Sequence, residues 1–138
     1  MKGIIGILTG MLLISSCSEA QVKTNNIAKK ETVASDIAQV NKVVSAKEFK
    51  ELLKKDNIQV IDVRTAGEVA DGKIENAVNI DYFGDDFKTK IAALDKSKVT
   101  LVYCKSGGRS GKAAKMMKDL GFVEVYDLKG GYSGWPFK

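Results

Sequence analysis

Apolar and polar positions alternate with two different periods along the C-terminal two-thirds of the chain. Short apolar runs predict β-strands at residues 57–63, 77–80, 98–103 and 123–126. Between them, apolar side chains recur at helical spacing and predict helices at residues 46–55, 66–71, 85–94 and 111–120. Strands that alternate with helices are typical of a parallel sheet covered by helices. The pattern therefore predicts an α/β fold with a central parallel β-sheet and helices on both faces.

Two of the predicted helices carry a start signal. Ser45 is followed three residues later by Glu48, and Thr65 is followed in the same way by Glu68. In this capping box, the hydroxyl and the carboxylate satisfy two backbone N–H groups that a helix N-terminus leaves without partners. We expect helices to begin directly after Ser45 and Thr65.

The first 17 residues, MKGIIGILTGMLLISSC, have the layout of a secretory signal peptide. One cation, Lys2, precedes an uncharged apolar run that ends in two serines. This run is shorter than the roughly 18 residues that a membrane-spanning helix needs, which favours a signal over a transmembrane anchor. Residues 13–17, LISSC, resemble the bacterial lipobox, in which the cysteine becomes the lipid-modified N-terminus. The resemblance implies that Cys17 is lipidated and that the exported protein is anchored to a bacterial membrane, facing the periplasm or the cell exterior.

Residues 18–42 are polar and contain no aromatic residue, whereas all ten aromatic residues lie between Phe49 and Phe137. A segment that buries too little apolar surface to offset its ordering entropy is predicted to be a flexible tether. The predicted organisation is a signal peptide with a lipobox at 1–17, a tether at 18–42 and a single domain at 43–138.

Charge and composition narrow the classes of function. Removal of the signal lowers the formal charge from +5 to +4, because it takes away Lys2 and no acid. That excess favours small anions or a lipid surface, and the absence of a basic block interleaved with aromatic residues speaks against nucleic acid. The chain has no histidine, which excludes Cys-His and Ser-His-Asp catalysis and any zinc site that needs imidazole. We expect no metal and no cofactor.

The candidate chemistry lies in CKSGGRS, residues 104–110, directly after a predicted strand. In parallel sheets, ligands bind outside the carboxyl ends of the strands. Gly107 and Gly108 allow backbone N–H groups to turn toward one point, and the following helix adds its positive end. Lys105 and Arg109 contribute two cations. Such surroundings lower the pKa of a thiol, so Cys104 is predicted to be a thiolate nucleophile rather than a buried structural sulfur.

Motifs that follow one another along the chain in the family's order resemble those of the rhodanese family. Residues 104–110 resemble its active-site loop, Cys-x-x-Gly-x-Arg-Ser. Residues 61–68 and 72–80 resemble its Asp-Val-Arg...Glu segment and the Gly-His-Ile-Pro-Gly-Ala-x-Asn-Ile stretch that follows. Residues 130–135 resemble its Gly-Gly...Trp close. Lys73 stands in place of the usual histidine, and Glu75-Asn76 in place of Pro-Gly, which affects turn geometry more than the loop.

The resemblance to single-domain rhodaneses implies a sulfurtransferase. Cys104 would take a sulfane sulfur from thiosulfate or a similar anion as a persulfide and pass it to cyanide or a thiol. Backbone N–H groups of Lys105, Ser106, Gly107, Gly108 and Arg109 would stabilise the persulfide charge, while the Lys105 and Arg109 side chains attract the donor. Asp62, Arg64 and Glu68 are interpreted as structural support at the edge of the sheet, and Trp135, Met116 and Met117 as packing.

Two other functions remain open from the sequence. One is a persulfide carrier or thiol-binding module that serves a protein partner without turning over free thiosulfate. The other is a cysteine-dependent phosphatase or arsenate reductase, which in related folds uses a Cys-x₅-Arg loop. Here the spacing from Cys104 to Arg109 is Cys-x₄-Arg, one residue shorter, which favours sulfur transfer.

Overall fold

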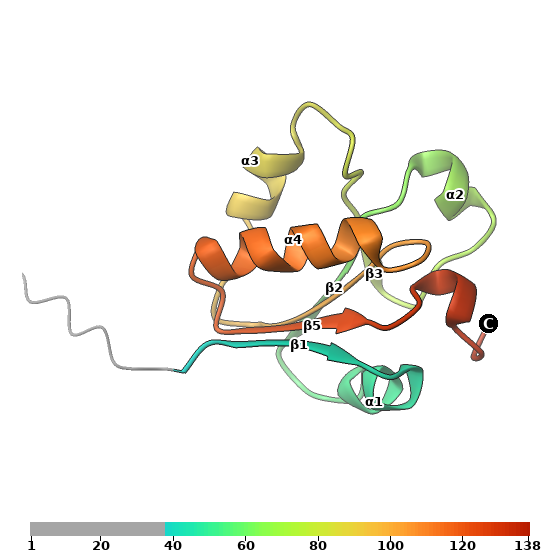
Figure 1. Ribbon diagram of the computed structural model, residues 1–138, viewed down its shortest axis with the longest axis horizontal. Helices are drawn as coiled ribbons and strands as arrows, with labels where there is room; N and C mark the ends of the chain where they lie inside the picture. The colour runs from blue at the N-terminus through green and yellow to red at the C-terminus, as the bar shows by residue number, and fades with distance from the viewer. Residues whose placement is uncertain (1–37) are drawn as a thin grey trace, which may run out of the picture. The chain divides into compact units, whose positions relative to one another are not determined.

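The computed structural model describes residues 38–138, in which five strands form one parallel sheet with the order β1-β5-β4-β2-β3 (Figure 1). The strands are β1 (Val40–Val44), β2 (Ile58–Asp62), β3 (Ala77–Asn79), β4 (Val99–Tyr103) and β5 (Glu124–Leu128). The helices are α1 (Ala46–Leu52), α2 (Ala66–Ala70), α3 (Phe87–Ala92), α4 (Gly108–Asp119) and the 3₁₀ helix η1 (Tyr132–Gly134). The predicted signal, the lipobox and most of the predicted tether lie outside the described residues.

Helices cover both faces of the sheet, as predicted. In Figure 1, α3 and α4 lie on one face and α1 on the other. Beneath α4, a buried cluster unites Ile61, Val102 and Cys104 with Ala113 and Met117 from the helix. On the α1 face, the buried core includes residues from strands β1, β2, β4 and β5 together with Phe49, Tyr103 and Trp135. Cys104 therefore lies within the buried core beneath α4, at the carboxyl end of the sheet.

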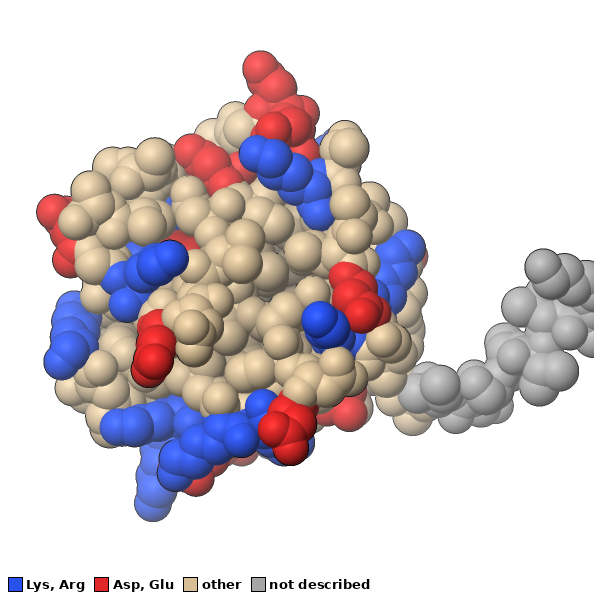
Figure 2. Space-filling model, turned by 180° about the vertical axis from the view of Figure 1, so that it is seen from behind, with Lys and Arg blue, Asp and Glu red and all other residues tan. Residues whose placement is uncertain are grey.

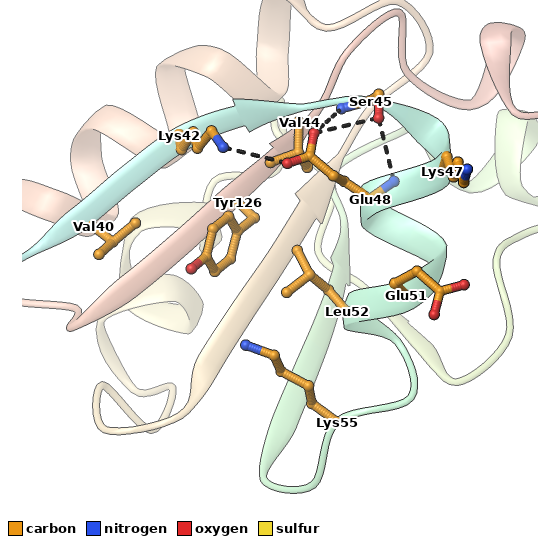
Figure 3. Close-up of a pocket in the computed structure, with 10 residues that line it drawn as sticks. All are labelled: Val40, Lys42, Val44, Ser45, Lys47, Glu48, Glu51, Leu52, Lys55 and Tyr126. Atoms are coloured by element: carbon orange, nitrogen blue, oxygen red, sulfur yellow. Dashed lines mark hydrogen bonds and ion pairs between the residues drawn. The ribbon is translucent and has the colours of Figure 1, made fainter.

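Both predicted capping boxes are formed. The Ser45 hydroxyl accepts the Glu48 N–H at the start of α1, and the Glu48 carboxylate accepts the Ser45 N–H in return, as Figure 3 shows. Thr65 and Glu68 do the same at the start of α2. The second box matters for the site, because it fixes Glu68 near the carboxyl edge of the sheet.

The structure corrects two boundaries. Strand β1 begins at Val40 and pairs with β5, so the predicted domain start at Val43 falls inside a strand, and Asn41 and Lys42 belong to the sheet rather than to the tether. Helix α4 begins at Gly108, three residues before the predicted start at 111, because Gly107 takes a positive φ of 104° and turns the chain into the helix. Arg109 and Ser110 therefore lie in the first helical turn.

The remaining elements have close to the predicted bounds, and β5 continues to Leu128. Asn76, which replaces a glycine of the resembled motif, takes a φ of 60°, a conformation that asparagine tolerates better than most residues. Lys73, which replaces a histidine, donates to the Ala77 carbonyl at 3.0 Å. Among residues 38–138, no helix is long and apolar enough to cross a membrane.

Candidate active site

Cys104 directly follows β4 and is 1% exposed. The Gly107 N–H donates to its Sγ at 3.0 Å, and the Ser110 hydroxyl donates to it from 3.5 Å. The positive φ of Gly107 then turns the chain from this N–H into α4, a conformation in which a side chain would be strained. The short segment from Lys105 to Gly107 thus wraps around the thiol.

The hydrogen bonds around Cys104 favour its charged form. Burial raises the pKa of the thiol, but the Ser110 hydroxyl and the backbone N–H groups of Ser110, Gly107 and Ser106 outweigh burial, so that the pKa lies below its ordinary value. Hydrogen bonds to a thiolate are the expected cause of such a shift in a chain without histidine. The sulfur is therefore prepared to act as a nucleophile.

A turn from the C-terminal region holds the loop from behind. The Tyr132 N–H donates to the Cys104 carbonyl at 2.8 Å, and the Ser133 N–H donates to the Lys105 carbonyl at 3.0 Å. Gly131 makes this approach possible, because a Cβ there would lie 2.5 Å from the Lys105 carbonyl carbon. The Gly-Gly pair read in the sequence thus shapes the Cys104 loop from a distant part of the chain.

Arg109 is paired rather than free. Its guanidinium donates to both carboxylate oxygens of Glu68, at 2.8 Å and 2.7 Å. The hydrogen bond from Arg109 is the main cause that lowers the pKa of Glu68 to about 2; burial opposes it, and Thr65 adds to it. Glu68 therefore offsets the charge that the sequence analysis assigned to donor attraction, and Arg109 instead ties α4 to α2.

The other predicted loop residues lie at the surface. Lys105, Ser106 and Gly108 are exposed, and Gly107 is half-buried. Lys105 lines a cavity of about 240 Å³ beside the loop, together with Arg64, Glu68, Asp71, Tyr132, Ser133 and Lys138. Two lysines, at 105 and 138, therefore line the cavity that lies next to the Cys104 loop.

Asp62 and Arg64 form a buried ion pair at the end of β2. The Arg64 guanidinium reaches the Asp62 carboxylate at 2.6 Å, and both side chains are almost fully buried. It also donates to the carbonyls of Glu68 at 2.9 Å and Gly72 at 2.7 Å. The pair therefore fastens α2 and the segment after it to the sheet edge.

Three contributions to the site were missed in the sequence. Ser110 was predicted only as the last residue of the loop pattern, with no role toward the thiol, although its hydroxyl contacts the sulfur. Arg109 and Glu68 are 41 residues apart, and nothing in their spacing indicates a contact. Asp127 fell outside the predicted last strand, although it belongs to β5 and is buried beside the first turn of α4. The run VEVYDL contains two acids, Glu124 and Asp127, and nothing in its pattern marks Asp127 as the buried one.

A second, more apolar cavity of about 440 Å³ lies elsewhere on the molecule. It is formed by β1, α1 and Tyr126 of β5, as Figure 3 shows. None of its lining residues belongs to the Cys104 loop. Figure 2 shows Lys and Arg side chains gathered along the lower edge of the molecule, the side on which α1 lies in Figure 1.

The fold and the loop together define a parallel α/β domain that presents a hydrogen-bonded thiol at the carboxyl edge of its sheet. Residues 45–137 match the Rhodanese-like domain family, and the chain belongs to that family.

Named relatives within this family differ in their described activity. The chain is 41% identical over 87 residues to a tRNA uridine(34) hydroxylase from Cytophaga hutchinsonii, covering 61% of this chain but only 28% of that protein. It is 37% identical over 95 residues to the putative sulfurtransferase YtwF of Bacillus subtilis, covering 68% of this chain and 89% of the relative. The fold also matches a rhodanese-related protein from Thermoplasma volcanium, with a TM-score of 0.61 and 30% identity over 68% of this chain and 89% of that one.

Proposed function

We propose that this domain is a sulfurtransferase that moves a sulfane sulfur from thiosulfate or a similar donor to a thiophilic acceptor through a persulfide on Cys104. The observation that carries the proposal is the hydrogen bonding of Sγ, which accepts the Gly107 N–H at 3.0 Å within a loop of the rhodanese pattern. Relatives described as sulfurtransferases, which the chain covers over most of their length, support it.

In the first step, the Cys104 thiolate attacks the outer sulfur of thiosulfate. A new S–S bond forms on Cys104, the S–S bond of thiosulfate breaks, and sulfite leaves with the electron pair. The persulfide that remains carries its negative charge on the outer sulfur. The backbone N–H groups of the loop around Gly107 are suited to stabilise that charge without reorganising.

In the second step, cyanide or a thiolate attacks the outer sulfur. The bond to Cys104 breaks, and the thiolate is regenerated for the next cycle, a two-step transfer whose kinetic mark is ping-pong behaviour. Because Glu68 pairs with Arg109, Lys105 and Lys138 are the cations that we assign to attract an anionic donor into the adjacent cavity.

Intact mass spectrometry tests the covalent step. The full chain carrying Cys17→Ser, which leaves Cys104 as the only thiol, is incubated with thiosulfate and weighed. We expect a gain of one sulfur atom that is lost on reduction and absent from a Cys17→Ser/Cys104→Ser control. A chain that gains no sulfur from thiosulfate contradicts the proposed donor and reaction.

Turnover separates the enzyme from a carrier. We expect the protein to convert thiosulfate and cyanide to sulfite and thiocyanate over many cycles. A persulfide that forms but is not passed to cyanide or to small thiols would instead indicate a carrier that serves a protein partner. Release of phosphate from an aryl phosphate at a comparable rate would overturn both and favour a phosphatase.

We further propose that the protein is held at a bacterial membrane by lipid on Cys17. The support is the LISSC pattern at the end of a signal-like segment. The test is labelling of expressing cells with a fatty-acid analogue, comparing wild type with Cys17→Ser. Label that persists in the variant would contradict an anchor at this residue, and so would wild-type protein without label.

A further inference from the structure

Asp127 is a buried carboxyl that the reaction proposed above does not use. It lies on β5, is 4% exposed, and its Oδ1 has no hydrogen-bond partner. Within residues 38–138 it is the only buried side-chain oxygen or nitrogen atom in that condition. Because a buried polar atom without a partner costs free energy, the position calls for an explanation.

The carboxyl lies beneath the first turn of α4. Its Oδ2 is 3.6 Å from the position that a Cβ of Gly111 would occupy, an ordinary contact distance that places the carboxyl directly beside this turn. Ser110 precedes Gly111 on that turn, and its side chain acts to lower the pKa of the Asp127 carboxyl, against the effect of burial. The Ser110 hydroxyl also reaches Sγ of Cys104 at 3.5 Å and the Gly107 carbonyl at 3.2 Å. One hydroxyl therefore stands between the buried acid and the nucleophile.

The strands beside Asp127 bring no counter-charge. In register it pairs with Val102 of β4 and Val43 of β1, both neutral. The titratable side chain on the same face of β4 is Cys104, two positions beyond Val102.

The charged side chains of α4 point into solvent or are already paired. Lys112 and Lys115 are exposed, and Lys115 pairs with Asp119 at 3.3 Å. Arg109 is bound to Glu68. Among the described residues, the groups that bear on the Asp127 carboxyl are thus the Ser110 hydroxyl and, through it, the thiol.

We propose that Asp127 is a positioning residue that decides where the Ser110 hydroxyl points and thereby tunes the reactivity of Cys104. The Ser110 hydroxyl has one proton to donate. When Asp127 is protonated, its own O–H donates to Ser110, and the hydroxyl proton is free for Sγ. When Asp127 is ionised, the carboxylate attracts that proton, and Sγ loses a donor while gaining a nearby negative charge. The inference rests on the proposed use of Cys104 as a nucleophile.

Asp127 changes its charge at a pH not far below neutral. Burial raises the pKa of Asp127 to about 6, and its interaction with Ser110 opposes part of that rise. A carboxylate and a thiolate on either side of one hydroxyl disfavour each other, so the loss of the Asp127 proton raises the pKa of the thiol. In a chain without histidine, this carboxyl is therefore able to impose pH dependence near neutrality.

Alkylation of Cys104 by iodoacetamide tests the proposal without using sulfur transfer. The full chain is alkylated at a series of pH values from about 4.5 to 9, spanning the ordinary ranges of carboxyl and thiol groups. The rate is followed on the tryptic peptide of residues 99–105, which contains Cys104 and not Cys17. We expect the wild-type profile to need two ionisations, and the Asp127→Asn profile to need one.

At pH values where Asp127 is ionised and most of the thiol is still protonated, Asp127→Asn should alkylate roughly 3- to 10-fold faster, which corresponds to a thiol pKa lower by about half a unit to one unit. The Asn amide can donate to Ser110 at every pH, as the protonated acid does. In a Ser110→Ala background, the same substitution should change the rate much less. Asp119→Asn, which neutralises an exposed acid on α4, is the matched control and should leave the profile unchanged.

Three outcomes would overturn the inference. The first is an alkylation profile of Asp127→Asn that superimposes on that of wild type. The second is an effect of Asp127→Asn on the alkylation rate that is equally large in the Ser110→Ala background. The third is an Asp119→Asn profile that changes as much as the Asp127→Asn profile. If Asp127→Asn does not fold, the wild-type and Ser110→Ala profiles decide, because the effect of the second ionisation must become much smaller once the hydroxyl is removed. Failure of sulfur loading with a positive alkylation result would refute the proposed reaction and leave the role of Asp127 intact.

Discussion

Replacing Gly131 with alanine should distort the Cys104 loop without touching any side chain of the site. Gly131 has φ 59° and ψ −160°, a region open almost only to glycine. A Cβ there would lie 2.5 Å from the carbonyl carbon and oxygen of Lys105 and 2.6 Å from the Cys104 oxygen. These are backbone atoms, so no rotamer change relieves the overlap, and the turn or the loop has to move.

The loss of folding free energy caused by Gly131→Ala has two parts. Backbone strain of this kind costs about 1–3 kcal/mol. Overpacking against atoms that cannot move aside costs typically about 1–3 kcal/mol more. The sum, about 2–6 kcal/mol, is a large share of the 5–15 kcal/mol that stabilises an ordinary domain, and corresponds to a drop in Tm of about 10 °C or more.

Gly121→Ala is the matched control. Gly121 also has a positive φ, of 90°, but a Cβ there meets nothing within 4 Å. The Gly121→Ala variant should therefore suffer the backbone strain without the overlap, and it should form the Cys104 persulfide at the wild-type rate. We would measure urea unfolding and the rate of persulfide formation for both variants. Equal losses of stability, or a Gly131→Ala variant that loads sulfur at the wild-type rate, would refute the argument that this turn shapes the loop.

Two further substitutions test the ion pairs around the site. Asp62→Asn should destabilise the domain by about 3–5 kcal/mol in urea unfolding, because it leaves the Arg64 charge buried without its carboxylate; a loss below 1 kcal/mol would contradict a buried pair. Glu68→Gln should cost about 1–2 kcal/mol near neutral pH, since the Glu68–Arg109 pair is partly exposed. The folded pKa of Glu68, about 2, lies below its ordinary 4.5, so its contribution is complete above pH 4.5 and is lost as the pH falls toward 2. Stability measured across that interval should converge for wild type and variant, and a constant difference would count against the assignment.

Most of the helices and strands could be predicted from patterns within short segments of the sequence. The capping boxes at Ser45 and Thr65 act within three residues, and both form as predicted. The apolar runs give the strands because buried strands of a parallel sheet are apolar on both faces. Strand β1 was missed because its pattern VNKVV is largely exposed at a sheet edge, where composition resembles that of a tether.

The candidate site could be predicted only for residues that are adjacent in the sequence. Residues 104–110 form one loop, and their chemistry follows from adjacent positions. The Glu68 pairing with Arg109 and the packing of Gly131 behind Cys104 depend on how distant segments meet. The positive φ of Gly107, which sets the start of α4, is one of several conformations that a glycine permits, and only the folded backbone selects it.

The pairing of β1 with β5 determines when, during translation, the first strand can gain its partner. β1 lies at the edge of the sheet, and its one ladder neighbour, β5, is translated some 80 residues later. The carbonyls of Cys104 and Lys105 likewise receive their hydrogen bonds from Tyr132 and Ser133, which follow β5. A growing chain therefore holds an unpaired first strand through most of its synthesis, and the Cys104 loop lacks these hydrogen bonds until the last residues of the chain are made. The loop that holds Cys104 is completed only after β5, the partner of the first strand, has been made.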